Sequence, residues 1–319
     1  MASFSFPKDI QSSLPLPAAK LPDGTNMFQW KGIMLSPQLL QAAITADKHF
    51  SARSTDIFVA SYPKCGTTWL KSLIFSIINQ HSLNQEKESP NPLLSTSPHD
   101  LIHNLELEVY SMDPIPDITG IPSPRLFSTH HSYGSLPESL KHCGCQIVYI
   151  TRNPRDSIVS FWHFTKKFSY HGLEYLSFEE TFERFCEGAL PFGPFFEHVL
   201  QYLKASKEMP EKVMFLTYEE MIADTKGVVK RVAAFLGRPV EEEKEVEKIV
   251  EMCSFEKLSN LEVNKSEDNT SKRRYPNNVF FRKGAVGDWM NHFTPEMIER
   301  LDHITQQKLQ GSGFEFRFD

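Results

Sequence analysis

SYPKCGTTWLK, residues 61–71, is the stretch that decides the fold. It follows the short apolar run DIFVA (56–60) and leads into WLKSLIFSIINQ (69–80), whose apolar residues recur at helical spacing. This order predicts a strand, a tight loop and a helix. Lys, Gly and two Thr in such a loop indicate a phosphate-binding site. Lys64, however, precedes Gly66 by two positions, whereas the lysine of the standard P-loop follows the last glycine directly.

Strand-like and helical runs alternate along the chain after this stretch. Such alternation predicts βαβ units and therefore an α/β fold with a central parallel sheet flanked by helices. With no internal repeat or composition break, we expect a flexible tail over 1–25 and a single domain over 26–319. We expect 81–124 to be a long excursion over the substrate side and 264–278 to be a mobile loop. The expected strands are 56–61, 125–129, 146–151 and 213–218, and the expected helices are 67–80, 155–167, 178–186, 194–208, 226–236, 241–253 and 295–308.

Composition excludes several classes of protein. The 319 residues include 34 basic and 40 acidic side chains, and this net charge of −6 argues against a general nucleic-acid binder. No apolar run reaches the length of a membrane span, and the N-terminus lacks the pattern of a secretory signal, so we expect a cytoplasmic protein. The five cysteines are odd in number and scattered, so neither a disulfide framework nor a zinc site is expected.

The loop itself has the chemistry of an anion site. Gly66 allows the backbone to approach an oxyanion closely. Thr67 and Thr68 stand at the start of the helix, where unpaired N–H groups and the helix dipole favour negative charge. Lys64, on the outer lip, would lie near the far end of a bound phosphate and neutralise a leaving group. The alternative is an ordinary strand-to-helix turn capped by threonine.

A second stretch, YITRNPRDSIVSFWHF (149–164), again has the order strand, loop, helix. Arg152 stands at the end of its strand, and Ser160 follows eight residues later, about two helical turns on. We interpret Arg152 and Ser160 as ligands of a second phosphate. The alternative for Arg152 is a surface salt bridge with Asp156.

A third stretch, FFRKGAVGDW (280–289), brings Arg282, Lys283 and Gly284 together. Arginine offers a planar fork of donors to a phosphate, and lysine offers a point charge. One such triplet is weak evidence, but three anion-binding loops in one chain indicate a ligand with more than one phosphate.

The motifs YPKCGTTWLK, RLFSTH, YITRNPRDSIVSFWHF and FFRKGAVGDW together resemble the ordered motif set of the cytosolic sulfotransferases. The cysteine in the loop resembles the plant branch, which includes flavonol, brassinosteroid and hydroxyjasmonate sulfotransferases. The match runs from about residue 28 to the C-terminus. It implies a fold like that of the P-loop nucleotide kinases. It also implies 3′-phosphoadenosine 5′-phosphosulfate (PAPS) as donor and a hydroxyl acceptor that becomes a sulfate ester.

The resemblance also implies roles for single residues. Lys64 would reach the bridging oxygen of the phosphosulfate, where negative charge builds as the S–O bond breaks. Thr129-His130 matches the end of a family motif, so His130 is the expected base; His131 is the alternative, and otherwise lines the acceptor pocket or faces solvent. The implied donor site comprises Lys64, Gly66, Thr67 and Thr68 at the 5′-phosphate, Arg152, Ser160, Arg282, Lys283 and Gly284 at the 3′-phosphate, and Trp69, Tyr218 and Phe255 around the adenine. Cys65 and Ser254 are also expected to bind the donor.

The chain departs from the animal members at several positions. Ser128 stands where many of them have a second active-site lysine, and Cys253 stands where a threonine often contacts adenine. Met290 and Pro295 replace the lysine and valine of the animal dimerisation motif, so we expect a monomer. Cys65 lies inside the phosphate loop, and its oxidation is a candidate means of blocking donor binding. No residue set calls for a metal, so we expect direct in-line transfer without metal or covalent intermediate.

The acceptor is less determined. The chain has 25 Phe, and the stretches 28–30, 161–168 and 191–203 would furnish an aromatic pocket suited to a flavonoid or another phenolic. A brassinosteroid, a hydroxyjasmonate or a desulfoglucosinolate is the alternative, and a hydroxyjasmonate would need an extra cation. Two other classes remain: an ATP-dependent phosphotransferase, which would want Mg²⁺ and a lysine after Gly66, and an inactive nucleotide-binding regulator.

Overall fold

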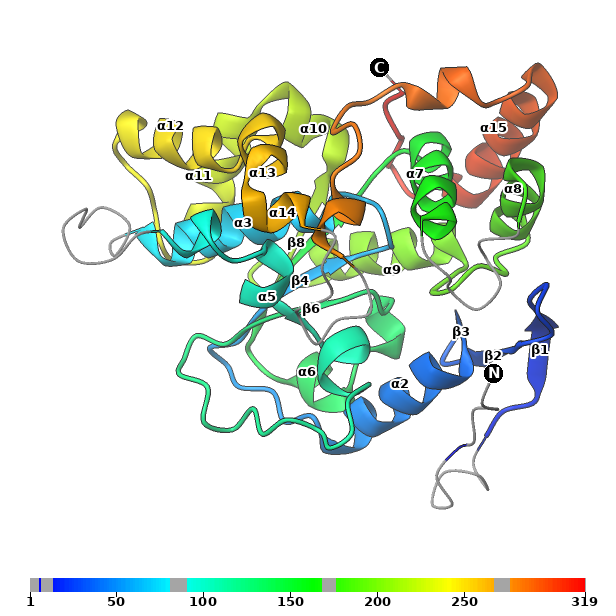
Figure 1. Ribbon diagram of the computed structural model, residues 1–319, viewed down its shortest axis with the longest axis horizontal. Coiled ribbons are helices and arrows are strands. Elements are labelled where there is room, and N and C mark those ends of the chain that lie inside the picture. The colour runs from blue at the N-terminus through cyan, green and yellow to red at the C-terminus, as the bar shows by residue number, and fades with distance from the viewer. Residues whose placement is uncertain (1–5, 7–13, 81–90, 168–175, 267–275, 319) are drawn as a thin grey trace.

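The computed structural model describes residues 6, 14–80, 91–167, 176–266 and 276–318. Its centre is a five-stranded parallel sheet in the order β5-β6-β4-β7-β8, with helices on both faces, as Figure 1 shows. A three-stranded antiparallel sheet, β1-β2-β3, lies beside it near the N-terminus. The strands are β1 Pro17–Lys20, β2 Asn26–Trp30, β3 Ile33–Leu35, β4 Ile57–Ser61, β5 His103–Asn104, β6 Leu126–Thr129, β7 Gln146–Thr151 and β8 Val213–Thr217.

Helices surround the large sheet and connect its strands. No helix within the described ranges is long and apolar enough to cross a membrane. The α-helices are α2 Pro37–His49, α3 Thr67–Ile78, α5 Pro98–Leu101, α6 Glu138–His142, α7 Pro154–Lys166, α8 Phe178–Cys186, α9 Phe195–Glu208, α10 Tyr218–Ala223, α11 Thr225–Phe235, α12 Glu243–Met252, α13 Phe255–Asn260, α14 Glu262–Lys265 and α15 Pro295–Leu309. Short helical turns are η1 Pro92–Leu94, η2 Leu105–Val109, η3 Tyr133–Ser135, η5 Asn277–Phe280 and η6 Asp288–Asn291.

The central strand β4 shows why the sheet is buried on both sides. Ile57 and Val59 pack with α3, α11 and α12 on one face, whereas Phe58 and Ala60 pack with α2, α6 and α9 on the other. Successive side chains of a strand point to opposite faces, so a strand covered on both needs an unbroken apolar run. The run of residues 57–60 meets this requirement.

The predicted core elements are confirmed. All four predicted strands form, and all seven predicted helices form with ends within two residues of those expected. The strand expected to end at residue 218 ends at Thr217, because Tyr218 begins α10. The parallel pairing of β4, β6, β7 and β8 confirms the expected sheet.

The N-terminal and 81–124 regions differ from expectation. The predicted tail over 1–25 contains β1, which pairs with β2, so the tail prediction is wrong for that strand; residues 1–5 and 7–13 lie outside the described chain. Within 91–124 the chain is more structured than expected: it supplies α5, η2 and β5, and β5 extends the sheet beyond β6. Most of the expected mobile loop, 267–275, lies outside the described residues.

Candidate active site

The phosphate loop joins β4 to α3 through two left-handed residues. Lys64 has φ 69° and Gly66 has φ 104°. A Cβ atom at Gly66 would lie 2.7 Å from Cδ2 of Tyr218 and 2.9 Å from Cδ1 of Ile150. Glycine is therefore required here for both its φ and the close approach of the loop to β7 and α10. This tight turn aims the first N–H groups of α3 into a cavity.

The cavity has a volume of about 340 Å³ and lies at the carboxyl ends of the strands, the usual ligand position in an open α/β sheet. It unites the three motif stretches, which are far apart in sequence. The predicted residues that line it are Lys64, Gly66, Thr67, Thr68, Trp69, His130, Arg152, Ser160, Tyr218, Ser254, Phe255, Arg282, Lys283 and Gly284. The structure thus assembles the predicted site with one exception.

That exception is Cys65. Its side chain is buried in the core behind the loop, with Sγ 3.4 Å from Oγ of Ser157, and it does not line the cavity. Burial raises the pKa of the Cys65 thiol to about 12. A buried thiol in its neutral form is inert. Cys65 was predicted to bind the donor, but its side chain does not reach the cavity, and its burial also argues against its oxidation as a control of that site.

His130 follows β6 and is held in one orientation by its neighbours. Its Nδ1 lies 2.8 Å from the carbonyl oxygen of Ser61 and donates to it, which leaves Nε2 without a proton. The Glu106 carboxylate accepts the His130 backbone N–H, and Nε2 of His198 donates to the His130 carbonyl at 3.0 Å. Burial lowers the pKa of His130, although Glu106 opposes this effect. His130 is therefore neutral near pH 7, as a general base must be.

His131, the alternative base, points away from the cavity. It is buried, its Nδ1 lies 3.1 Å from the carbonyl oxygen of Ser135, and its ring packs against Trp30 at 5.9 Å between centroids. It neither lines the cavity nor faces solvent, so both predictions for His131 are wrong. Adjacent residues at a strand end point to opposite sides, and only His130 points to the cavity.

Lys64 sits in an environment that disfavours a bare ammonium group. Its Nζ lies 3.8 Å from the centroid of the Phe164 ring and 5.6 Å from that of Phe280. Burial, together with the positive charges of Arg282 and Lys167, lowers the pKa of Lys64 to about 7. An anion bound in the cavity would reverse this effect, because opposite charge stabilises the protonated form.

Arg152 lies between β7 and α7 in a buried network. Its Nη2 donates to the carbonyl of Ala285 at 2.6 Å and lies 3.2 Å from the carboxylate of Asp156. The salt bridge offered as an alternative therefore exists, but it is buried inside the site. Asp156 also accepts the backbone N–H groups of Gly287 at 2.8 Å and Trp289 at 3.1 Å. Asp156 thus ties the third motif to the second.

Arg282 and Lys283 both pair with Asp288, at 2.5 Å for Arg282. Burial raises the pKa of Asp288, but hydrogen bonds from Lys283 and Arg282 outweigh it and hold the pKa well below its usual range. A Cβ atom at Gly284, which has φ 63°, would overlap the ring of Phe255. The segment that carries the two cations therefore packs closely against the aromatic ring of Phe255 in the cavity wall.

Several cavity residues escaped the sequence analysis. Oγ1 of Thr68 lies 2.9 Å from Nε2 of His99, and Nζ of the buried Lys71 lies 3.1 Å from Nδ1 of the same ring. The His99 ring stacks on Phe280 with centroids 3.8 Å apart. Lys71 stands in the opening motif one helical turn beyond Thr68, so its position on the same face of the helix was a usable signal. His99 carried no such signal, because it comes from the 81–124 region.

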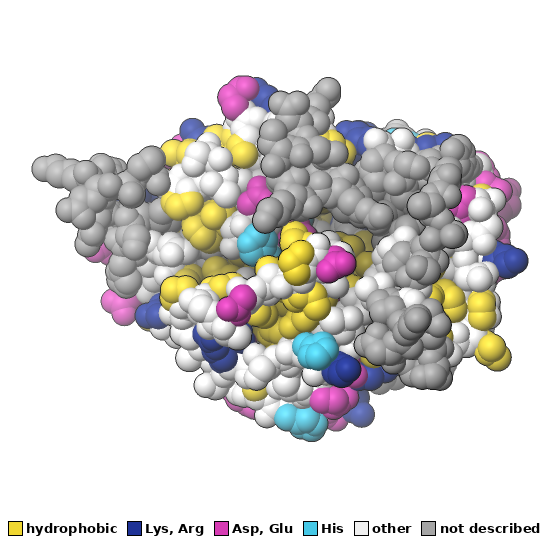
Figure 2. Space-filling view, turned by 60° about the horizontal axis from the view of Figure 1, so that its bottom comes forward, with side chains coloured by type: hydrophobic (Ala, Val, Ile, Leu, Met, Phe, Trp, Pro, Cys, Tyr) yellow, Lys and Arg dark blue, Asp and Glu magenta, His cyan; other side chains and the backbone are white. Residues whose placement is uncertain are grey.

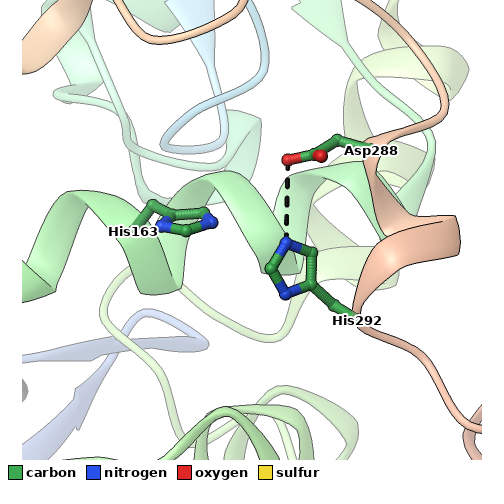
Figure 3. A group of neighbouring side chains, drawn as sticks. All are labelled: His163, Asp288 and His292. Carbon is green, nitrogen blue, oxygen red and sulfur yellow. Dashed lines mark ion pairs between the residues drawn. The ribbon is translucent and has the colours of Figure 1, made fainter.

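A second group of side chains meets at the edge of this cavity. Figure 3 shows His163 of α7 facing Asp288 and His292. Their potential ligating atoms all lie within 4.8 Å of one another, and Nε2 of His292 is 3.9 Å from Asp288. The sequence analysis did not associate these three residues, since α7 and η6 are distant in sequence.

The comparisons with known proteins agree with this geometry. Residues 54–313 match the family described as "Sulfotransferase domain". The chain is 44% identical over 314 residues to cytosolic sulfotransferase 5 of Arabidopsis thaliana, covering 97% of this chain and 96% of that protein. It is 41% identical over 296 residues to cytosolic sulfotransferase 15 of the same plant, covering 91% and 82%.

Solved structures give the same result. A protein from Arabidopsis thaliana assigned as a steroid sulphotransferase superposes with a TM-score of 0.77 at 36% identity, over 97% of this chain and 94% of that one. A mouse sulfotransferase complexed with PAP (3′-phosphoadenosine 5′-phosphate) superposes with a TM-score of 0.70 at 29% identity. The match covers 90% of this chain and 95% of the mouse chain. The chain belongs to the sulfotransferase family. The predicted fold and the predicted class, a PAPS-dependent sulfotransferase of plant type, are confirmed.

Proposed function

We propose that the protein transfers the sulfuryl group of PAPS to a hydroxyl of a small acceptor by direct in-line displacement. The observation that carries this proposal is that His130, with Nε2 deprotonated, and Lys64 line one cavity together with the three anion-binding segments. A base and a leaving-group cation thus face the same space, as one displacement requires.

The described residues fit the donor. The cavity offers the N-terminus of α3, the space at Gly66, and the cations of the second and third motifs. Two buried donors in its wall, Nε1 of Trp69 and Nε of Arg152, have no hydrogen-bond partner among the described residues. Buried donors of this kind are normally satisfied, so their state favours a polar ligand. When bound, PAPS supplies the activated sulfuryl group.

Each catalytic residue has one task in this proposal. His130 accepts the acceptor's hydroxyl proton on Nε2 as the oxygen attacks sulfur. Lys64 stabilises the negative charge on the phosphate oxygen that leaves. Ser128 is buried and lies outside the cavity lining, so Lys64 acts there without a second lysine from that position. The step as proposed requires neither a metal nor a covalent sulfo-enzyme.

A flavonoid or another phenolic is our proposed acceptor. The cavity lining includes Phe161, Phe164, Phe192 and Phe280, and the Phe192 ring lies 5.4 Å from that of His130. Flat aromatic acceptors suit such walls, because ring pairs contribute about 0.5–1.5 kcal/mol beyond area burial. Figure 2 shows hydrophobic side chains gathered near the centre of one face of the molecule, with histidine and acidic side chains among them.

An anionic acceptor such as a hydroxyjasmonate is the second candidate, and one observation favours it. Lys167 lines the cavity, and its charge acts on Lys64, so an extra cation is present where the sequence analysis found none. Glu108 also lines the cavity and would repel a carboxylate, which is why we place the neutral phenolic first.

The test is product formation with PAPS in buffer that contains EDTA, using a flavonol, a hydroxysteroid and a hydroxylated carboxylic acid. We expect a sulfate ester and PAP, with the highest kcat/KM for the flavonol. Lys167→Met should lower kcat/KM for the carboxylic acid alone. Phosphoryl transfer from Mg-ATP with no sulfate ester from PAPS would contradict the proposal.

We also propose a cytoplasmic monomer. The curated relatives at 44% and 41% identity are named cytosolic. Met290, at a position of the animal dimerisation motif, is 68% exposed, and Pro295 begins α15 in that motif. Sedimentation at micromolar concentration should give a single species of about 37 kDa, the mass of one chain; a species of twice that mass would contradict the monomer.

A further inference from the structure

We propose that His163, Asp288 and His292 form a binding site for a divalent transition metal such as Zn²⁺, and that donor binding strengthens this site. Two imidazoles and one carboxylate are a common ligand set for zinc and its first-row neighbours. Figure 3 shows the three side chains converging from α7 and η6. This inference rests on the proposed function, because the donor is its second ligand.

The separations are close to those that a metal needs. The ligating atoms lie within 4.8 Å of one another, whereas ligands 2.0–2.1 Å from a tetrahedral Zn²⁺ are about 3.4 Å apart. The widest of these separations would have to shrink by about 1.4 Å to close the site. His292 follows the short helix η6, its side chain is 22% exposed, and its ring lies 5.2 Å from that of His163.

In the structure, Asp288 has other partners. Its carboxylate accepts from Arg282 and Lys283, and from Nδ2 of Asn291 at 3.1 Å. A metal would have to take these oxygens and would meet two positive charges. Without donor, the site is therefore weak.

Donor binding would change this balance. Arg282 and Lys283 line the cavity and are the proposed ligands of the 3′-phosphate. A phosphate dianion attracts both cations more strongly than one carboxylate does, and releases Asp288 toward His163 and His292. It also compensates the charge that a divalent ion would add beside these cations. The two ligands should therefore bind cooperatively.

Cooperativity of this kind is reciprocal. If the bisphosphate product PAP tightens Zn²⁺ binding by some factor, Zn²⁺ must tighten PAP binding by the same factor. Coupling of this type is commonly about 5–150-fold, and we expect at least about tenfold. This equality checks that the two titrations report the same coupling, and the histidine variants show where the zinc binds.

The experiment measures Zn²⁺ affinity by competition with a chromophoric chelator, with and without PAP, and PAP affinity with and without Zn²⁺. All measurements use protein that carries the Cys143→Ser substitution. Cys143 and Cys145 lie close together, with the backbone N of Cys145 3.3 Å from Sγ of Cys143, and their two thiols would otherwise compete for zinc. In that background, both affinities should tighten by the same factor. His163→Gln and His292→Gln should each abolish the coupling, whereas His142→Gln, on the exposed end of α6, should keep it.

Equal Zn²⁺ affinity with and without PAP would overturn the proposal. So would coupling that persists in both His163→Gln and His292→Gln, because zinc would then bind the nucleotide or another site. Failure of PAP to bind the metal-free wild type is a different result: it would refute the proposed function first. PAP affinity without metal should stay within about threefold of wild type in His292→Gln, which shows that the variant is folded.

Discussion

Donor affinity should fall steeply as the pH rises above 7, because of Lys64. In the structure, burial and the charge of Arg282 lower the Lys64 pKa from 10.5 to about 7. A bound phosphosulfate or PAP places negative charge beside the ammonium and raises that pKa again. The affinity that Lys64 contributes is therefore complete below pH 7. It is lost progressively as the pH rises from 7 toward the pKa of the complex.

The size of the effect follows from the shift. One pKa unit corresponds to about 1.4 kcal/mol, or tenfold in an equilibrium constant. If the complex restores the ordinary pKa of 10.5, PAP affinity falls about tenfold for each pH unit between 7 and 10. From pH 7 to pH 9 the Kd should rise by roughly 50-fold, because half of the Lys64 side chains are already neutral at pH 7.

Calorimetry of PAP binding at pH 7, 8 and 9, with EDTA throughout, measures this slope. Lys64→Arg is the matched control, because a guanidinium keeps its charge over this range. Its PAP affinity should be nearly flat with pH, although its geometry lowers the affinity overall. A wild-type Kd that changes less than about threefold between pH 7 and 9 would refute the reasoning, as would the same slope in Lys64→Arg.

The remaining predictions concern the base, the 3′-phosphate ligands and the loop. His130→Ala should lower kcat by roughly 10²–10⁴ and leave the Kd for PAP within about twofold; activity that survives the change would exclude His130 as base. Arg282→Glu should lower the affinity for PAP far more than the affinity for 5′-AMP, which lacks the 3′-phosphate. The control Arg300→Glu, on the exposed face of α15, should lower neither affinity. Equal losses of affinity for both nucleotides would show that Arg282 does not bind the 3′-phosphate. Gly66→Ala should lower the free energy of unfolding by about 1–3 kcal/mol and also weaken PAP. Gly237→Ala is the control: Gly237 has φ 66° and no neighbour within 4 Å of an added Cβ, so this variant has only the cost of the left-handed backbone. An equal loss of unfolding free energy in the two variants would show that the close approach of Tyr218 to Gly66 does not matter.

The parts of the fold that the sequence predicted are those with strong local signals. The buried strand over 57–61 and the helix after Gly66 are periodic and long enough to be read directly. The strand β1 was missed because its residues are mostly exposed and show no alternation. The short helices α13 and α14 lack the length at which helical periodicity becomes visible.

The same distinction separates the site residues that the sequence predicted from those that it did not. Cavity residues that belong to a motif were predicted, since their spacing encodes a loop at a strand end. Motif spacing does not say in which direction each side chain points. Cys65 and His131 were therefore predicted at the site, although they are buried away from the cavity that their neighbours Lys64 and His130 line. The contact of Asp156 with Gly287 spans 131 positions of sequence. No local pattern predicts a contact of that range, and it decides where the third motif lies.

The measurement that tests the central claim most directly is donor binding by calorimetry, with PAP in EDTA against ATP with Mg²⁺, on wild type and Lys64→Ala. We expect PAP to bind wild type tightly without metal, Mg-ATP to bind at least about 100-fold more weakly because it lacks the 3′-phosphate, and Lys64→Ala to weaken PAP. Preference for Mg-ATP, or PAP binding that ignores the loss of Lys64, would contradict the assignment of this cavity to the sulfuryl donor.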